Sequence, residues 1–368
     1  MKYAARGLRW FVGVLFALLA LSMALTGNWL QAVPLVLLLF LLLPSDARFR
    51  QVTGRSPPWW ARTIAIVLLL LDFVWLGSLT KYTSAIYKSP EVKARFMQMY
   101  AERMKTWPVP YEDVFVETEY GKVHVIVSGR KQAPPLVLLH VSGVASWSWQ
   151  YNIKELDRHY RTYAIDTLGD AGRSELKSRG HYPADGKAQA SLYSEIFDKL
   201  GIQSAYIVGG SEGGFIATNI TLYAPKRVKK LVLLGPMGFG GTTESVLRIM
   251  LIQFFPLKSI QESTVRWAFG DNPGPRQVAG EWFRLMMTGT FPRKARPIAF
   301  TPERLEKIRV PVLLVLGKRD NLVGDAENTR RLAHNIPDVQ IKVLETGHFI
   351  SVEQPGEVDR LIVKFLGT

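Results

Sequence analysis

The pentapeptide Gly209-Gly210-Ser211-Glu212-Gly213 constrains the fold of this chain more than any other stretch. An apolar run, Ala205 to Val208, comes directly before it and predicts a buried strand, and the residues from Phe215 to Ile220 can start a helix. Strand, sharp turn and helix in this order would present the Ser211 hydroxyl at a helix N-terminus, where backbone N–H groups favour an oxyanion. The glycines fit this interpretation, because strand and helix would meet too closely for side chains there. The alternative is an ordinary glycine-rich turn, and the rest of the chain has to distinguish the two.

Composition limits the chemistry that is open to the chain. Its 368 residues are enough for one large domain and an accessory region. It has no cysteine, which excludes disulfides, thiol nucleophiles and cysteine metal sites. We find no metal-binding constellation and no nucleic-acid motif, so we expect no cofactor, no metal and no nucleic-acid partner. The net charge is +15. Seven of the basic residues stand at or before Arg62 against a single acid, Asp46, which suits a membrane surface.

Three apolar runs predict a membrane region over residues 1–81 with about three transmembrane helices. The runs are Trp10 to Thr26, Trp29 to Leu43 and Thr63 to Leu79. The flanking basic residues favour a cytoplasmic N-terminus, so we expect an integral, multi-pass membrane protein that contacts the lipid bilayer and has its C-terminal domain on the extracytoplasmic side. For the first run, a cleaved secretory signal is the alternative. Asp72 interrupts the third run, where it is either a helix-packing polar residue or a functional one.

From residue 82 onward the pattern becomes that of a globular protein. Residues 82–110 are polar and mixed, and they predict a helical linker. Residues 111–368 begin with a hairpin pattern and then alternate short apolar strands with helices, which predicts an α/β domain with a parallel sheet and helices on both faces. Residues 237–305 interrupt this alternation with a mostly helical segment rich in phenylalanine, tryptophan and methionine, as an inserted helical cap would.

Two residues much further along the chain could form a catalytic set with Ser211. Asp320 and His348 each come just after an apolar strand, at the edge where open α/β sheets place their sites. A serine needs a base to become a nucleophile, and the base needs an acid to orient it. We therefore predict Ser211, Asp320 and His348 as catalytic residues. Other residues that could serve as base or acid are His334, in a predicted surface helix, and Asn321 and Asp325, which follow their strand less directly.

Together these features resemble the α/β-hydrolase fold superfamily, from about Val114 to Leu366. The resemblance rests on the strand that ends in His140, the loop from Asp166 to Ser174, the turn at Ser211, and the Gly317…Asp320 and Gly347-His348 loops. It implies that Ser211 is the nucleophile, that His348 acts as general base and acid, and that Asp320 orients the histidine. It also implies an oxyanion hole made by the backbone N–H of Glu212 and one from the loop after His140, which we place at Ser142, with Val141 as the alternative.

The chain departs from the family's pattern at three places. His140-Val141-Ser142 stands where His-Gly is usual, and the loop that begins at Asp166 has one residue more than D-x-x-G-x-G-x-S. Glu212 puts a carboxylate beside the nucleophile, where its charge would disfavour an anionic substrate or raise nearby pKa values.

The resulting expectation is a membrane-anchored serine hydrolase of the carboxylesterase or lipase type that forms an acyl-enzyme on Ser211. Its substrate would be a small ester, with a thioester or an amide as further possibilities. The apolar residues between 237 and 305 predict an apolar substrate, because a cap lies over the strand ends and would line the pocket above Ser211. Two other interpretations stay open: a carbon–carbon bond hydrolase with the same triad, and a non-catalytic binding protein on this fold.

Overall fold

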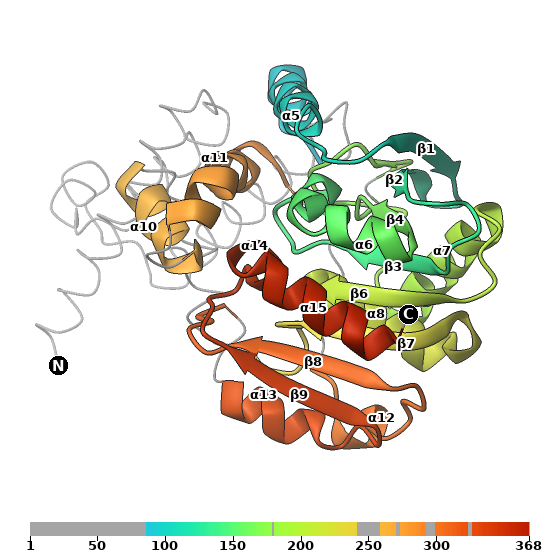
Figure 1. The fold of residues 1–368 in the computed structure, drawn as a ribbon. Helices are drawn as coiled ribbons and strands as arrows, with labels where there is room; N and C mark the ends of the chain where they lie inside the picture. Colours follow the sequence, from blue (N-terminus) through green and yellow to red (C-terminus); the bar gives the residue numbers. More distant parts are fainter. Residues whose placement is uncertain are drawn as a thin grey trace, which may run out of the picture. The chain divides into compact units, whose positions relative to one another are not determined.

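The computed structural model describes residues 86–178, 180–240, 258–269, 273–291, 299–322 and 326–367. These residues form a nine-stranded sheet with the strand order β1-β2-β4-β3-β6-β7-β8-β9, in which β5 pairs with β2 (Figure 1). The strands are β1 (Tyr111–Glu117), β2 (Gly121–Ser128), β3 (Pro135–Leu139), β4 (Arg161–Ile165), β5 (Glu175–Leu176), β6 (Ala205–Gly210), β7 (Val228–Leu234), β8 (Val312–Gly317) and β9 (Val339–Leu344). The helices are α5 (Pro90–Met104), η1 (Ser146–Tyr151), α6 (Ile153–His159), α7 (Gly186–Lys199), α8 (Glu212–Tyr223), η2 (Pro225–Arg227), α10 (Lys258–Phe269), α11 (Pro273–Gly289), α12 (Pro302–Leu305), α13 (Ala326–Ala333), α14 (Ile350–Glu353) and α15 (Pro355–Leu366).

The sheet is mixed, and its larger part is parallel. Strands β4, β3, β6, β7, β8 and β9 pair in parallel, whereas β2 pairs antiparallel with both β1 and β4. The predicted leading hairpin and the alternation of strands with helices are therefore confirmed. The antiparallel strands stand at one edge, where the hairpin adds to the parallel core.

Both faces of the sheet are buried, which explains the continuous apolar runs in the sequence. Leu136 and Leu138 of β3 lie in one hydrophobic cluster with residues of α6 and α15, and Val137 and Leu139 lie in a second cluster with residues of α7 and α8. Successive residues of β3 lie in different clusters because the pleat of a strand points successive side chains to opposite faces of the sheet. Figure 1 shows α6 and α15 on one face of the sheet.

The strand order reverses at β3. From β3 the chain passes to β4 on one side, and it later returns as β6 on the other side of β3. In open α/β sheets, the crevice beyond the carboxyl ends of the strands at such a reversal is where ligands bind. The loops that follow β3 and β6 therefore begin at this reversal point.

Residues 86–110 contribute a packed helix. Ser89 caps α5, since its hydroxyl accepts a hydrogen bond from the N–H of Val92 at 3.3 Å. The buried face of α5 includes Phe96, whose ring meets Trp282 of α11 with 4.8 Å between centroids. The segment predicted as a helical linker thus contains a helix that packs on α11. The proposed divisions at 82–110, 111–368 and 237–305 stay predictions.

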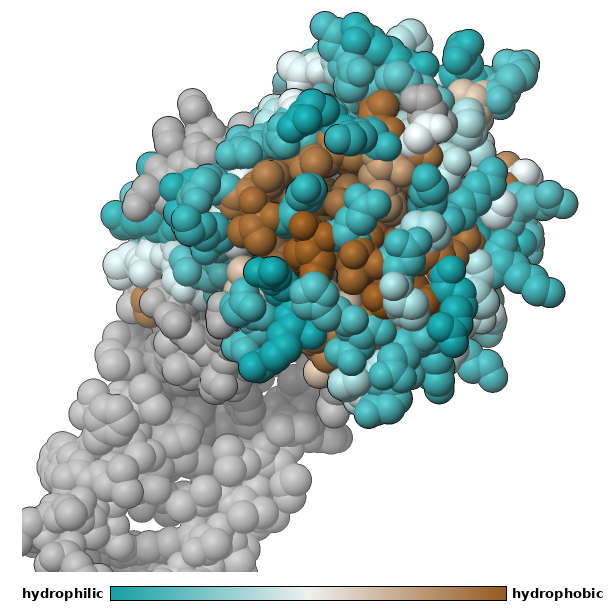
Figure 2. Space-filling view, turned by 60° about the horizontal axis from the view of Figure 1, so that its bottom comes forward, coloured by the Kyte–Doolittle hydropathy of each residue, from teal (hydrophilic) through white to brown (hydrophobic). Residues whose placement is uncertain are grey.

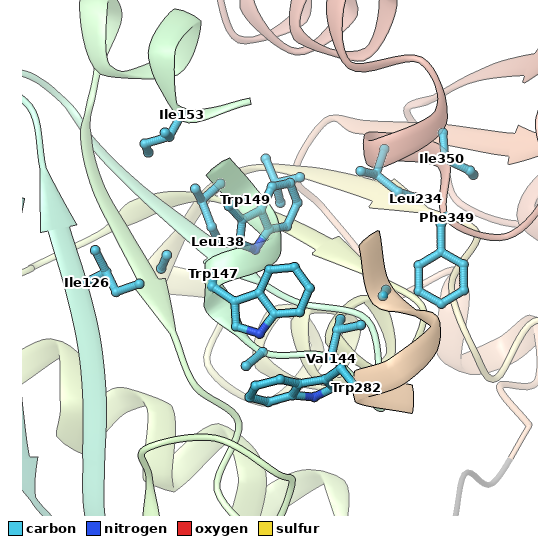
Figure 3. Close-up of a cluster of buried hydrophobic side chains, with 14 of the residues drawn as sticks. Ile126, Leu138, Val144, Trp147, Trp149, Ile153, Leu234, Trp282, Phe349 and Ile350 are labelled. Atoms are coloured by element: carbon cyan, nitrogen blue, oxygen red, sulfur yellow. The ribbon is translucent and has the colours of Figure 1, made fainter. Parts of the chain in front are cut away.

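Helices α10 and α11 stand between β7 and β8 in the chain, where the sequence predicts an inserted cap. Figure 3 shows Trp282 of α11 beside Val144 and Trp147, and Phe349 nearby. The rings of Trp147 and Trp282 have centroids 5.5 Å apart. Helix α11 therefore packs on the segment that follows β3. Residues 241–257, 270–272 and 292–298 of the predicted cap lie outside the described residues.

The prediction of an integral, multi-pass membrane protein is contradicted. In the part of the chain that the structure describes, no helix has both the length and the apolar character to cross a bilayer. The longest described helix, α11, has 17 residues and includes the charged residues Arg276, Glu281 and Arg284, whereas a spanning helix needs about 20 mostly apolar residues. The three apolar runs behind the prediction lie within residues 1–85, outside the described residues.

Apolar residues also reach the surface. Tyr111, Phe115, Tyr223 and Val343 are large hydrophobic residues that are well exposed. Figure 2 shows a face on which hydrophobic residues gather near the centre and hydrophilic residues surround them. Single exposed apolar residues are normal, whereas a group bordered by polar residues is typical of a contact surface.

Candidate active site

Ser211 stands at the sharp turn between β6 and α8. Its φ of 50° is positive, and no other non-glycine residue in the described part of the chain has a positive φ. Such a backbone conformation costs free energy, and it persists only where the surroundings impose it. Three backbone hydrogen bonds do so: the N–H of Ser211 donates to the carbonyl of Leu234, and its own carbonyl accepts from the N–H groups of Phe215 and Met237, all at 3.0 Å.

Glycines on either side make this turn possible. A Cβ on Gly209 would overlap the carbonyl of Gly213, and a Cβ on Gly213 would overlap the carbonyl of Leu139. The sequence prediction that strand and helix meet too closely for side chains at these two positions is therefore confirmed. The serine side chain is held next to the first turn of α8, whose backbone N–H groups are suited to an anion.

Asp320 and His348 form a buried pair. Asp320 follows β8 and His348 follows β9, and Oδ2 of the aspartate lies 2.8 Å from Nδ1 of the histidine. The other carboxylate oxygen, Oδ1, accepts a hydrogen bond from the N–H of Leu322 at 2.8 Å. Both residues are buried, with 8% and 3% of their surfaces exposed. With Nδ1 engaged by the carboxylate, Nε2 is the nitrogen that can exchange a proton with a reacting group.

The segment after β7 connects this pair with Ser211. Leu234 binds the N–H of Ser211, and the next residue, Gly235, touches the pair. A Cβ on Gly235 would stand 3.1 Å from Oδ2 of Asp320 and 3.7 Å from Nδ1 of His348. The three predicted catalytic residues thus follow β6, β8 and β9 at the carboxyl edge of the parallel strands, and the segment after β7, which lies between β6 and β8, contacts all three.

The loop after β3 lies beside the turn at Ser211. A Cβ on Gly210 would come within 2.9 Å of the side chain of Val141, so this loop packs against the residue before the nucleophile. The two predicted oxyanion donors, Ser142 and Glu212, stand in this loop and at the start of α8. The side chain of Glu212 is buried and makes contacts of its own, so the carboxylate is part of the interior of the site.

A second buried histidine–carboxylate pair was not singled out by the sequence analysis. His124 of β2 lies between Asp166 and Asp113, with Nδ1 2.9 Å from Oδ2 of Asp166 and Nε2 2.8 Å from Oδ1 of Asp113. Arg173 binds Asp113 at 2.8 Å, and the hydroxyl of Tyr100 reaches Asp166 at 3.4 Å. This network joins α5, the leading hairpin and the loop after β4. The sequence signal was weak, because His124 stands within an otherwise apolar strand.

Charge pairing in this network shifts the pKa values of its members. Burial alone would lower the pKa of His124, but hydrogen bonds with Asp113 and Asp166 outweigh it and raise that pKa above its ordinary value. The hydrogen bond from His124, with Arg173 nearby, lowers the pKa of Asp113 to about 2. Burial would raise the pKa of Asp166, yet the hydrogen bond and charge of His124 hold it well below its usual range. The network is therefore a set of mutually compensating charges.

Comparisons with known proteins agree with this fold. A model of the alpha/beta hydrolase family matches residues 136–361. The chain is 31% identical over 288 residues to carboxylesterase YbfK of Bacillus subtilis, which covers 76% of this chain and 96% of that protein. The crystal structure of naproxen esterase (carboxylesterase NP) from Bacillus subtilis superposes with a TM-score of 0.70 at 28% identity, covering 76% of this chain and 100% of that one. A 2-hydroxy-6-oxo-2,4-heptadienoate hydrolase of Pseudomonas putida is 27% identical over 252 residues, which is 63% of this chain and 88% of that protein.

The fold and these similarities identify a hydrolase on an α/β sheet, and the chain belongs to the alpha/beta hydrolase family. It is an enzyme, and its similarity to bacterial carboxylesterases supports the hydrolysis of an ester. These carboxylesterases are matched over nearly their whole length by about three quarters of this chain, which gives the prediction of a membrane protein no support.

Proposed function

We propose that this protein is a serine hydrolase that cleaves a small-molecule ester through an acyl-enzyme on Ser211. The observation that carries the proposal is the buried His348–Asp320 pair, 2.8 Å apart, beside a serine held at a φ of 50°. A serine on a strained turn, together with a histidine whose Nδ1 is oriented by an acid, matches the requirements for activating a serine. The similarity to carboxylesterases supports the choice of an ester. The strained backbone at Ser211 also favours a catalytic over a non-catalytic role, because such conformations cluster at functional sites.

The chemistry follows from these positions. Oγ of Ser211 attacks the ester carbonyl carbon while Nε2 of His348 takes the serine's proton, and Asp320 holds the imidazole and compensates its charge. The N–H groups of Ser142 and Glu212 bind the oxyanion of the tetrahedral intermediate. His348 then returns the proton to the departing alkoxide, which leaves as an alcohol. Water attacks the acyl-enzyme with His348 again as the base, which releases the acid and restores Ser211. No metal or cofactor is needed for these steps.

The side chains of α11 favour an apolar acyl group. Phe283 and Met286 lie against Gly143, the residue after Ser142, since a Cβ on Gly143 would come within 3.0 Å of Phe283 and 2.7 Å of Met286. An acyl chain bound next to the oxyanion donors would meet these apolar groups. Each methylene that it buries contributes about 0.8 kcal/mol, or about four-fold in kcat/KM. We therefore propose that the substrate is an apolar ester; thioesters and amides react by the same steps and remain candidates.

A carbon–carbon bond hydrolase is the second candidate. It is supported by the similarity to a 2-hydroxy-6-oxo-2,4-heptadienoate hydrolase, at lower identity and lower coverage than the similarity to the carboxylesterases. The same triad can serve a different bond, so the site geometry alone favours neither.

Purified protein should be assayed with p-nitrophenyl acetate, butyrate and octanoate and with a 2-hydroxy-6-oxo-dienoate. We expect ester turnover with kcat/KM rising from acetate to octanoate, and little turnover of the dienoate. Ser211→Ala gives the background rate. Turnover of the dienoate without ester turnover would favour the second candidate. A series that peaks at acetate would contradict the apolar acyl site while leaving the ester proposal intact.

A further inference from the structure

The loop after β4 is longer than the family's pattern by one residue, and the extra length falls between Gly169 and Gly172, where Asp170 and Ala171 stand. The N–H of Asp170 donates to the carbonyl of Thr167 at 3.1 Å, and Gly169 has a φ of 89°, so a tight turn places the aspartate. Asp170 is 1% exposed. A buried carboxylate is costly unless it is hydrogen-bonded, so its partners should reveal what it does.

Both carboxylate oxygens of Asp170 accept backbone N–H groups. Oδ1 accepts from Ala171 at 2.8 Å, within its own loop, and Oδ2 accepts from Gly143 at 3.0 Å, in the loop after β3. The second bond joins residues that are 27 positions apart. It therefore ties the loop after β4 to the loop that carries the proposed oxyanion donor.

His140 ties the same two loops a second time. Its Nε2 lies 2.9 Å from the N–H of Thr167, which can only donate, so Nε2 is the unprotonated nitrogen. The proton is then on Nδ1, which donates to the carbonyl of Val141 at 2.8 Å. Because a trans peptide is planar, holding the carbonyl of Val141 toward His140 turns the N–H of Ser142 to the opposite side.

Ser142 thus lies between two fixed peptide planes. The plane before it is held by His140 through the carbonyl of Val141, and the plane after it is held by Asp170 through the N–H of Gly143. Gly143 has a φ of 77°, a region that favours glycine, so the chain turns sharply at this point. The loop is also packed at two points, since Phe283 lies against Gly143 and Gly210 lies against Val141.

We propose that Asp170 is a positioning residue, whose carboxylate holds the Ser142–Gly143 peptide and so aims the N–H of Ser142 at the substrate's carbonyl oxygen. The proposal rests on the proposed function, because it assigns Ser142 an oxyanion to bind. Oxyanion donors act only when they are already in place as charge develops, and a displacement of about 1 Å can cost 100-fold in rate.

The test compares Asp170→Ala and Asp170→Asn with the wild type on p-nitrophenyl octanoate or the best ester found. Asp185→Ala is the matched control, because Asp185 also accepts a backbone N–H, from Ala188 at 2.9 Å, but is exposed and caps α7. For Asp170→Ala we expect kcat to fall about 10- to 100-fold with KM changed by less than about three-fold. Asp170→Asn keeps the volume and loses one acceptor, so its kcat should fall between those of Asp170→Ala and the wild type. Asp185→Ala should keep the wild-type kcat.

A folded Asp170→Ala protein with the wild-type kcat would overturn the proposal, and so would a change confined to KM. If Asp170→Ala does not fold, Asp170→Asn serves as the test, because a wild-type kcat in that variant would also overturn the proposal.

Hydrogen exchange at the amide of Gly143 provides a readout that does not depend on the substrate. Exchange should be slow in the wild type and faster in Asp170→Asn. If the wild type hydrolyses no ester while exchange behaves as expected, the proposed function fails and the positioning by Asp170 stands. Equal exchange in both proteins overturns the positioning.

Discussion

At the scale of single residues, two histidines near the C-terminus, His348 and His334, can be compared as candidate bases. His348 is buried and lies 2.8 Å from Asp320, whereas His334 is exposed just beyond α13. Only His348 has an acid to orient it and a position next to the turn at Ser211. We expect His348→Ala to lower kcat for an ester by roughly 10⁴-fold or more, because members of such a triad act as a unit. His334→Ala should stay within about two-fold of the wild type. Similar losses in both variants, or none in either, would refute the assignment of the base.

At the scale of elements, an asparagine and an aspartate join the segment after β3 to α15. Asn152 precedes α6, and its Nδ2 donates to Oδ1 of Asp359 at 2.8 Å and to the carbonyl of Ser351 at 3.2 Å. The amide oxygen Oδ1 of Asn152 is buried without a hydrogen-bond partner. Burial, helped by the charge of Glu155, raises the pKa of Asp359 from 3.8 to about 7 against the effect of the Asn152 bond. Ser351 belongs to α14, which follows His348 closely, so the contact also supports the loop of the proposed base.

The burial of Asp359 makes stability depend on pH. The folded state holds the proton of Asp359 more tightly than the unfolded chain does. The favourable contribution of Asp359 to the free energy of unfolding is therefore complete below about pH 4 and is lost as the pH rises to about 7. Asp359→Asn is neutral throughout and can also donate to the amide oxygen of Asn152. We expect its Tm, relative to the wild type, to rise by a few degrees between pH 5 and pH 8, at about 2–4 °C per kcal/mol. The control is Asp198→Asn, which changes an exposed carboxylate paired with Arg227 and should show a difference that varies little with pH. A Tm difference between Asp359→Asn and the wild type that stays the same from pH 5 to pH 8 would show that the folded state does not raise the pKa of Asp359.

At the scale of the whole molecule, local patterns in the sequence predicted more than long-range ones. The turn at Ser211 lies between the predicted strand and the predicted helix, because both depend on contiguous residues. The strand order and the pairing of β2 with β4 depend on tertiary contacts that no local pattern records. The contacts of His124 with its two carboxylates, and the hydrogen bond from the N–H of Gly143 to Asp170, join distant positions through side chains and were missed for the same reason. The membrane prediction counted apolar residues in the first 79 positions, and neither the described helices nor the similarity to carboxylesterases supports it.

The central claim is that Ser211 is the nucleophile, and covalent labelling tests it most directly. The purified protein should be incubated with a fluorophosphonate, which bonds to an activated serine with loss of fluoride, and then digested for mass spectrometry. We expect one adduct per chain, on the peptide that contains Ser211, with labelling abolished in Ser211→Ala and strongly slowed in His348→Ala. An adduct on another residue, or undiminished labelling of Ser211→Ala, would contradict it.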